Sequence, residues 1–229
     1  MVPRRAARSL DIRNELSALQ SVEAPPDRAQ LRAAALSYLA RYASTQAGLA
    51  RVLDRRIDTW ARKIGSRHET GEQDRAAVAA AVIGAKAMVR EVVATLTQAG
   101  AVSDAAFAEV RASSLRRAGR SHRAVAAALA AKGVDPETVR AALDNEEVGG
   151  DAAELTAAVR LARKRRIGPF HVGKPPHSPG HLRELAILAR AGFAQPVARQ
   201  ALGMELAAAE ALLSAPAVSA AEPHAEASG

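Results

Sequence analysis

The chain has 229 residues, a net charge of +8 and no cysteine. The missing cysteine excludes disulfides, thiolate metal sites and cysteine nucleophiles, and no apolar run reaches the roughly 18 residues of a membrane span. A composition of 48% hydrophobic and 24% charged residues indicates a globular protein whose positive charge favours an anionic partner, either nucleic acid or an acidic protein surface.

Both ends of the chain differ in composition from the middle. Residues 1–28 are basic at the start, lack the apolar core of a secretory signal and contain Pro25-Pro26. Residues 214–229 are rich in Ala, Ser, Glu and Pro. We predict a disordered N-terminal arm and a disordered C-terminal tail.

The first third of the middle region predicts three helices. Apolar residues recur at helical spacing from Leu31 to Tyr42 and again from Leu49 to Ile64. Ser44 and Thr45 are suited to cap the second helix, and a break is expected over residues 65–71. Trp60, near the end of this helix, is expected in the hydrophobic core. A long third helix is predicted from Asp74 to Gly100.

Three shorter helices follow at regular intervals. Ser103 is expected to cap a helix that Gly119 ends, and Ser121 a second that Gly133 ends. Asp135, followed by proline and glutamate, predicts the start of a third.

The last third repeats this pattern around a long loop. Asp151 and Glu154 have the spacing of a capping box before a helix ending near Ala162. A loop is predicted at 168–180, then a helix from Leu182 and a final one over 196–213. Strand signals are nearly absent, so the sequence predicts an all-α fold.

Weak self-similarity groups the helices into triplets. About nine helices fall into tandem three-helix repeats at 29–100, 101–147 and 148–213. The alternative is that the helices resemble each other only because all of them are rich in alanine. The division into three repeats is therefore a prediction from the sequence pattern alone.

Signatures of catalysis are missing. There is no phosphate-binding glycine loop, no H-E-x-x-H and no nucleophile elbow. His171, His177 and His181 share one loop, but their spacing fits no usual metal site. Aromatic residues, at 3%, are too few for RNA-recognition sheets or OB folds. We therefore expect neither enzyme, cofactor nor metal.

Basic residues free of neighbouring acids are the main candidate binding surface. No acid occurs between Arg111 and Lys132, or between Leu155 and Arg183. A merely solvated helical face usually has interspersed Glu, so we predict a positive ridge that contacts phosphates or an acidic groove. The predicted contact residues are Arg111, Arg116, Arg117, Arg120, Arg123, Lys132, Arg163, Lys164, Arg165 and Arg166.

A helix-turn-helix is an alternative for the middle of the chain. Residues 121–132, a glycine turn and residues 135–143 have suitable lengths. The second helix, however, carries only Arg140 together with Glu137 and Asp144, whereas a helix that reads bases is expected to hold more Arg, Asn or Gln.

Four motifs follow one another in the middle of the chain. They are Gly-Ala-Val-Ser-Asp-Ala-Ala-Phe-Ala at 100–108, Arg-Arg-Ala-Gly at 116–119, Val-x-x-x-Leu-x-x-Lys-Gly-Val at 125–134 and Val-x-x-x-Leu at 139–143. Together they resemble the central block of the bacterial RecX family of recombinase regulators. Weaker matches occur in the family's order at 34–53, 163–170 and 182–202.

The resemblance implies a fold and a function. The fold would be an elongated, curved array of tandem three-helix repeats without a catalytic site. The function would be regulation of homologous recombination, DNA repair and the SOS response: a cytoplasmic monomer, with no membrane association, binds the RecA filament on single-stranded DNA and inhibits its ATPase, strand-exchange and coprotease activities. Weak direct binding to single-stranded DNA is a further expectation. The alternatives are a helix-turn-helix transcriptional regulator and a helical scaffold that binds no nucleic acid.

Overall fold

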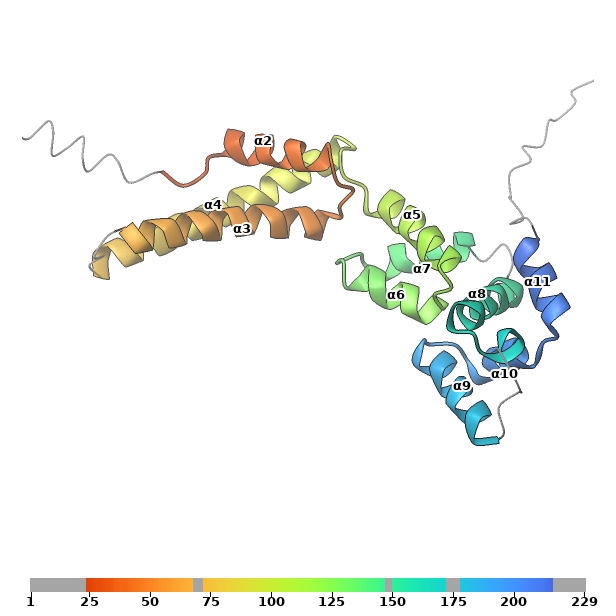
Figure 1. Cartoon of the computed structure of the whole chain (residues 1–229). Helices are drawn as coiled ribbons and strands as arrows, with labels where there is room; N and C mark the ends of the chain where they lie inside the picture. The colour runs from red at the N-terminus through yellow and green to blue at the C-terminus, as the bar shows by residue number, and fades with distance from the viewer. Residues whose placement is uncertain (1–23, 68–71, 147–149, 172–177, 216–229) are drawn as a thin grey trace, which may run out of the picture. The chain divides into compact units, whose positions relative to one another are not determined.

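The computed structural model describes residues 24–67, 72–146, 150–171 and 178–215. These residues form ten α-helices and one short 3-10 helix, without a strand among them (Figure 1). The predicted all-α fold is confirmed. The chain divides into two compact units, residues 1–103 and 104–229. Within the described ranges no helix is long and apolar enough to cross a membrane.

Unit 1 contains three helices whose starts follow local capping rules. The Asp27 side chain accepts from the Gln30 amide at 2.7 Å, and the Gln30 side chain accepts from the Asp27 amide, which is a reciprocal capping box. Thr45 Oγ1 accepts from the Gly48 amide at 2.9 Å, so the predicted cap is confirmed there. The helices are α2 (Arg28–Leu39), α3 (Gln46–Arg67) and α4 (Glu72–Gln98).

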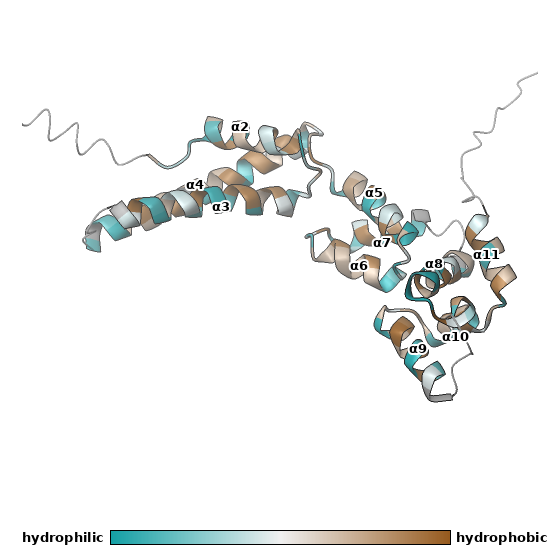
Figure 2. Cartoon of the chain, viewed as in Figure 1, coloured by the Kyte–Doolittle hydropathy of each residue, from teal (hydrophilic) through white to brown (hydrophobic). Residues whose placement is uncertain are grey.

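The core of unit 1 lies where these three helices pack together. Leu49, Leu53 and Ile57 form one buried stripe along α3, and the alternation of hydrophobic and hydrophilic residues along that helix is visible in Figure 2. Val89 and Leu31 bring α4 and α2 into the same cluster. Trp60 is also buried, as predicted. The helix break predicted over 65–71 is confirmed: α3 continues through Gly65 and ends at Arg67, and α4 begins at Glu72.

Unit 2 contains shorter helices separated by tight turns. Ser121 caps one by accepting from the Ala124 amide at 3.2 Å, and Asp135 caps the next by accepting from the Thr138 amide at 2.9 Å. Both caps were predicted. The elements are α5 (Asp104–Arg117), α6 (His122–Ala130), α7 (Pro136–Glu146), α8 (Gly150–Arg165), η1 (Gly168–Phe170), α9 (Ser178–Arg190), α10 (Gln195–Gly203) and α11 (Leu206–Ser214).

Two hydrophobic clusters stabilise unit 2. Helices α5, α6 and α7 bury Val125 and Leu129 against alanines of α5. Helices α8 to α11 bury Val159, Leu188 and Phe193. Small alanines at the helix contacts allow close packing, so short helices bury apolar area together that none could bury alone.

Two local predictions in unit 2 were wrong. Asp151 and Glu154 form no capping box, because α8 begins at Gly150 and the Glu154 carboxylate bonds to another helix. The helix predicted over 196–213 is broken, since Met204 is extended and separates α10 from α11. Both helices nevertheless pack on the same cluster.

Candidate functional site

The turn between α5 and α6 is the structural centre of unit 2. Ser121 Oγ donates to the Ala191 carbonyl at 2.6 Å, which ties this turn to the turn after α9. At Gly192, with φ +92°, a Cβ would lie 2.6 Å from that Oγ, and at Gly119, with φ +79°, a Cβ would lie 3.1 Å from the Leu161 amide nitrogen. Glycine permits both this conformation and this close approach.

A buried ion pair fastens the same region. Arg116 of α5 bonds to the Glu154 carboxylate of α8 and donates from Nη1 to the Arg120 carbonyl at 2.9 Å. Glu154 also accepts from the His122 backbone amide at 3.2 Å. Arg116 is only 5% exposed, so it departs from the predicted exposed ridge. Its guanidinium connects α5 to α8 and is not available to bind a ligand.

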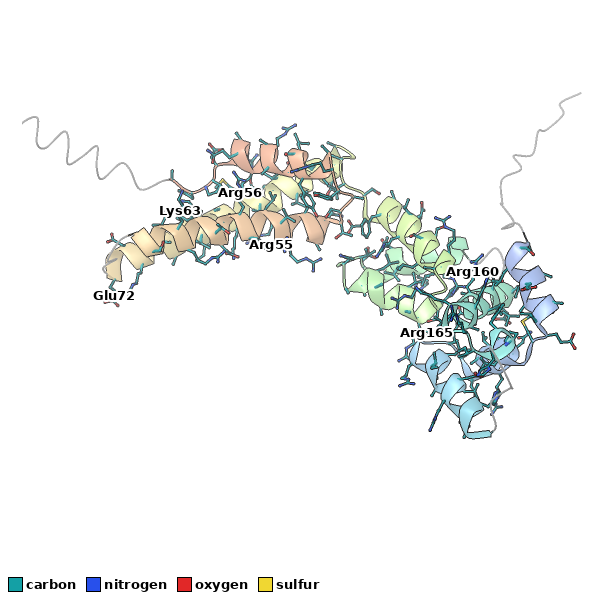
Figure 3. All side chains as sticks on the ribbon, viewed as in Figure 1. Arg55, Arg56, Lys63, Glu72, Arg160 and Arg165 are labelled. Atoms are coloured by element: carbon teal, nitrogen blue, oxygen red, sulfur yellow. The ribbon has the colours of Figure 1, made fainter. Side chains whose placement is uncertain are left out.

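Beside this joint lies a cleft of about 400 Å³. Its apolar lining consists of Leu161 of α8, Ile187 of α9, Ala118 and Ala191. Four cationic side chains from three separate segments line it, and none of the acids in the described residues does: Arg120, Lys164, Arg165 and Arg190. Of these four, Arg165 of α8 is labelled in Figure 3.

The cations of the cleft sit at helix C-terminal ends. Lys164 and Arg165 are in the last turn of α8, Arg190 is the last residue of α9, and Arg120 follows the end of α5. A helix C-terminus carries partial negative charge, so the backbone there does not attract an anion. Any attraction for an anionic partner therefore comes from the side chains themselves.

The structure brings together three of the ten predicted contact residues. Arg120, Lys164 and Arg165 line the cleft. The other exposed predicted residues lie outside its lining: Arg111, Arg117, Arg123, Lys132, Arg163 and Arg166. The Cβ of Arg123 lies beside Gly192, close to the cleft-lining Ala191.

Sequence reasoning missed Arg190. Arg190 is the only basic residue in its turn of α9, two residues before Gly192, and it does not belong to a cluster of basic residues in the sequence. Its place in the cleft depends on the packing of α9 beside α8. The helical spacing of Arg183, Ile187 and Arg190 would have put them on one face of α9.

A second group of cations lies in unit 1, along α3. Figure 3 labels Arg55, Arg56 and Lys63 there. Asp54 and Asp58 alternate with these cations, and Asp58 accepts a salt bridge from a lysine of α4 at 2.9 Å. Interspersed charge of this kind is typical of a solvated helix face.

The histidines do not gather into a site among the described residues. His171 and His181 are exposed, while His177 lies outside the described residues. Within the ranges that the structure covers, no group of three or more metal-ligating side chains is found.

Known proteins resemble this chain in sequence. The family model for the second three-helix domain of RecX matches residues 103–143, the segment that contains α5, α6 and most of α7. No solved structure matches the chain.

Curated relatives extend the likeness beyond that domain. The "Regulatory protein RecX" of Myxococcus xanthus is 39% identical over 172 residues, which cover 75% of this chain and 83% of the relative. The protein of the same name from Agrobacterium fabrum is 36% identical over 114 residues, covering 50% of this chain and 58% of the relative.

The described residues form an all-α protein of small helical clusters with a cationic cleft. The sequence identity to these relatives, and the share of both chains that it covers, assign the chain to one family. It belongs to the RecX family of regulatory proteins.

Proposed function

We propose that this protein regulates homologous recombination and DNA repair by binding the RecA recombinase filament on single-stranded DNA and inhibiting its ATPase, strand-exchange and coprotease activities. It would act without catalysing a reaction, as a cytoplasmic monomer. Membership of the RecX family supports the regulatory role. The observation that carries the proposal is the cleft lined by four cations and by no acid of the part of the chain that the structure describes.

The chemistry of the cleft favours anionic partners. Exposed guanidinium and ammonium groups can bind DNA phosphates or the carboxylates of a protein surface. A nucleoprotein filament offers both kinds of anion. Guanidinium groups suit both, because they bind carboxylate and phosphate in bidentate geometry.

The predicted ridge is retained in part. The exposed residues outside the cleft are proposed as the outer part of the same contact: Arg111, Arg117, Arg123, Lys132, Arg163 and Arg166. Arg116 is withdrawn from the contact, because it is buried against Glu154.

A helix-turn-helix regulator of duplex DNA is the rival function. Helices α6 and α7 with the intervening glycine turn have the required lengths. The exposed charges of α7, however, include Glu137 and Asp144 beside Arg140, and carboxylates would oppose close approach to a phosphate backbone.

The test is a titration of this protein into RecA bound to single-stranded DNA, with ATP hydrolysis as the readout and a DNA-free reaction as the control. We expect inhibition well below one molecule per RecA protomer. Unchanged hydrolysis together with sequence-specific duplex binding would overturn the proposal and support the rival. Unchanged hydrolysis without DNA binding would support a scaffold.

A further inference from the structure

The six aromatic side chains of this protein differ in their exposure to solvent. The chain has six aromatic residues, and all of them lie in the described ranges. Two are buried and three are half-buried, whereas Tyr42 alone is exposed, at 54%. The five covered residues are Trp60, Phe193, Tyr38, Phe107 and Phe170. An aromatic ring left in solvent by so aromatic-poor a chain is a candidate for contact with a partner.

The fold holds the Tyr42 ring in place. Its backbone amide donates to the Tyr38 carbonyl at 3.0 Å, one turn back at the end of α2. The two ring centroids are 5.1 Å apart with the planes inclined by 39°. Tyr38 is itself packed against the core cluster of unit 1. Tyr42 is therefore oriented by a ring that the core anchors, and little side-chain entropy remains to be lost on binding.

Positive charge accompanies the ring. The Arg41 guanidinium carbon lies 5.8 Å from the Tyr42 centroid, and Arg41 Nε donates to the Ser37 carbonyl at 3.2 Å. The surrounding sequence, residues 28–53, contains four arginines and no acid. An exposed ring beside a cation, in an acid-free segment, is the combination that single-strand-binding proteins use for a base and its phosphate.

We infer that Tyr42 is a stacking platform for an unpaired base of single-stranded DNA, with Arg41 neutralising a neighbouring phosphate. Bases within a duplex are stacked on each other, so this platform selects single strands. The inference deepens the proposed function, because it assigns a ligand to unit 1. It rests on the proposed function in one respect, namely that the single-stranded DNA is the strand in the RecA filament. Binding to the free strand itself requires no RecA.

The experiment compares oligonucleotides that differ only in their bases. Fluorescence anisotropy would measure binding of a labelled thymidine oligonucleotide, and of an abasic oligonucleotide with the same length and charge, to the full chain without RecA. Tyr42→Ala should weaken thymidine binding at least about five-fold, since one base–aromatic stack contributes that much or more. Binding to the abasic strand should be unchanged, and Tyr42→Phe should retain wild-type binding to both.

Leu36→Ala is the matched control. Leu36 lies on the same helix and is also an exposed apolar residue, at 43%, and its truncation should leave binding to both oligonucleotides unchanged. Circular dichroism would verify that every variant keeps its helices.

One outcome overturns the inference: Tyr42→Ala binds the thymidine strand with the affinity of the wild type, including the case in which neither binds. If that variant also loses RecA inhibition, Tyr42 is a protein contact. Conversely, a wild-type protein that stacks bases through Tyr42 but does not inhibit RecA would overturn the proposed function and leave this inference standing.

Discussion

The Glu154 carboxylate of α8 forms a buried ion pair with Arg116 of α5, and so joins the two hydrophobic clusters of unit 2. Both side chains are mostly shielded, at 17% and 6% exposure. The carboxylate also accepts from the His122 amide at the start of α6. One acid thus holds three helices, and the cationic cleft lies beside this joint.

Removal of that acid should destabilise unit 2. Glu154→Ala leaves the Arg116 charge buried without its partner, and we expect a loss of about 3 kcal/mol in the free energy of unfolding. Urea unfolding followed by circular dichroism measures it. The double variant Arg116→Met with Glu154→Leu should recover much of the loss, because no unpaired charge is then buried.

Arg117→Ala is the control for this experiment. Arg117 is the next residue along the chain and is exposed, so its truncation should change stability by less than about 0.5 kcal/mol. A Glu154→Ala variant as stable as Arg117→Ala would contradict a structural role for the pair.

A methyl group at Gly192 should be poorly tolerated. Alanine there would take a φ of +92° and would bring its Cβ to 2.6 Å from Ser121 Oγ, so we expect a loss of about 1–3 kcal/mol. Gly84 lies in the interior of α4, where an added Cβ would meet nothing within 4 Å, and Gly84→Ala should instead raise stability by about 0.5–1 kcal/mol. Thermal unfolding of the two variants should therefore show opposite shifts.

The helix caps were predictable because their chemistry is local. The cap bonds of Ser121 and Asp135 come from amides three residues further along the chain, and a linear pattern contains all of that information. Glu154 has the same local signature, yet its carboxylate bonds to Arg116, 38 residues away. A tertiary partner overrode the cap, and nothing in the spacing distinguishes the two cases.

The cleft was predictable only in part for a related reason. Lys164 and Arg165 belong to a dense basic run that draws attention in the sequence. Arg190 is a lone cation, and its inclusion depends on α9 packing against α8. The prediction for Arg116 was wrong because helical spacing gives a residue's face but not what packs on that face.

The cap of α7 should make stability depend on pH. Hydrogen bonds from Thr138, first through its side chain and then its backbone, and from the Glu137 amide lower the pKa of Asp135 below its ordinary 3.8. A group with a lowered folded-state pKa stabilises the fold above its unfolded pKa, and this contribution is lost as the pH falls through the folded pKa.

Asp135→Asn separates the cap from its charge. The amide oxygen can still cap the helix but does not titrate. We expect the difference in unfolding free energy between wild type and Asp135→Asn to shrink as the pH is lowered from neutral to below 3.8. Urea unfolding at a series of pH values checks this, and a difference that stays constant over the series would show that the carboxylate is not stabilised in the fold.

Salt should weaken the proposed partner contact. Contacts between cations and phosphates or carboxylates are screened, and phosphate binding also releases counterions. Inhibition of RecA measured at increasing potassium chloride should therefore need progressively more protein, at salt concentrations where RecA alone remains active. A requirement that does not change with salt would favour a contact made by apolar surface, as a scaffold would make.

The most direct measurement tests whether the cleft carries the inhibition. Arg165→Glu with Arg190→Glu reverses two cations of the cleft, and Arg140→Glu with Arg199→Glu reverses two exposed arginines outside its lining, with the same change in net charge. The readout is ATP hydrolysis by RecA on single-stranded DNA, titrated with each variant. Our account predicts that the cleft variant requires at least ten-fold more protein, corresponding to about 1.4 kcal/mol, while the other variant inhibits like wild type. Equal inhibition by both variants would contradict it, and selective loss in the Arg140 variant would support the helix-turn-helix rival.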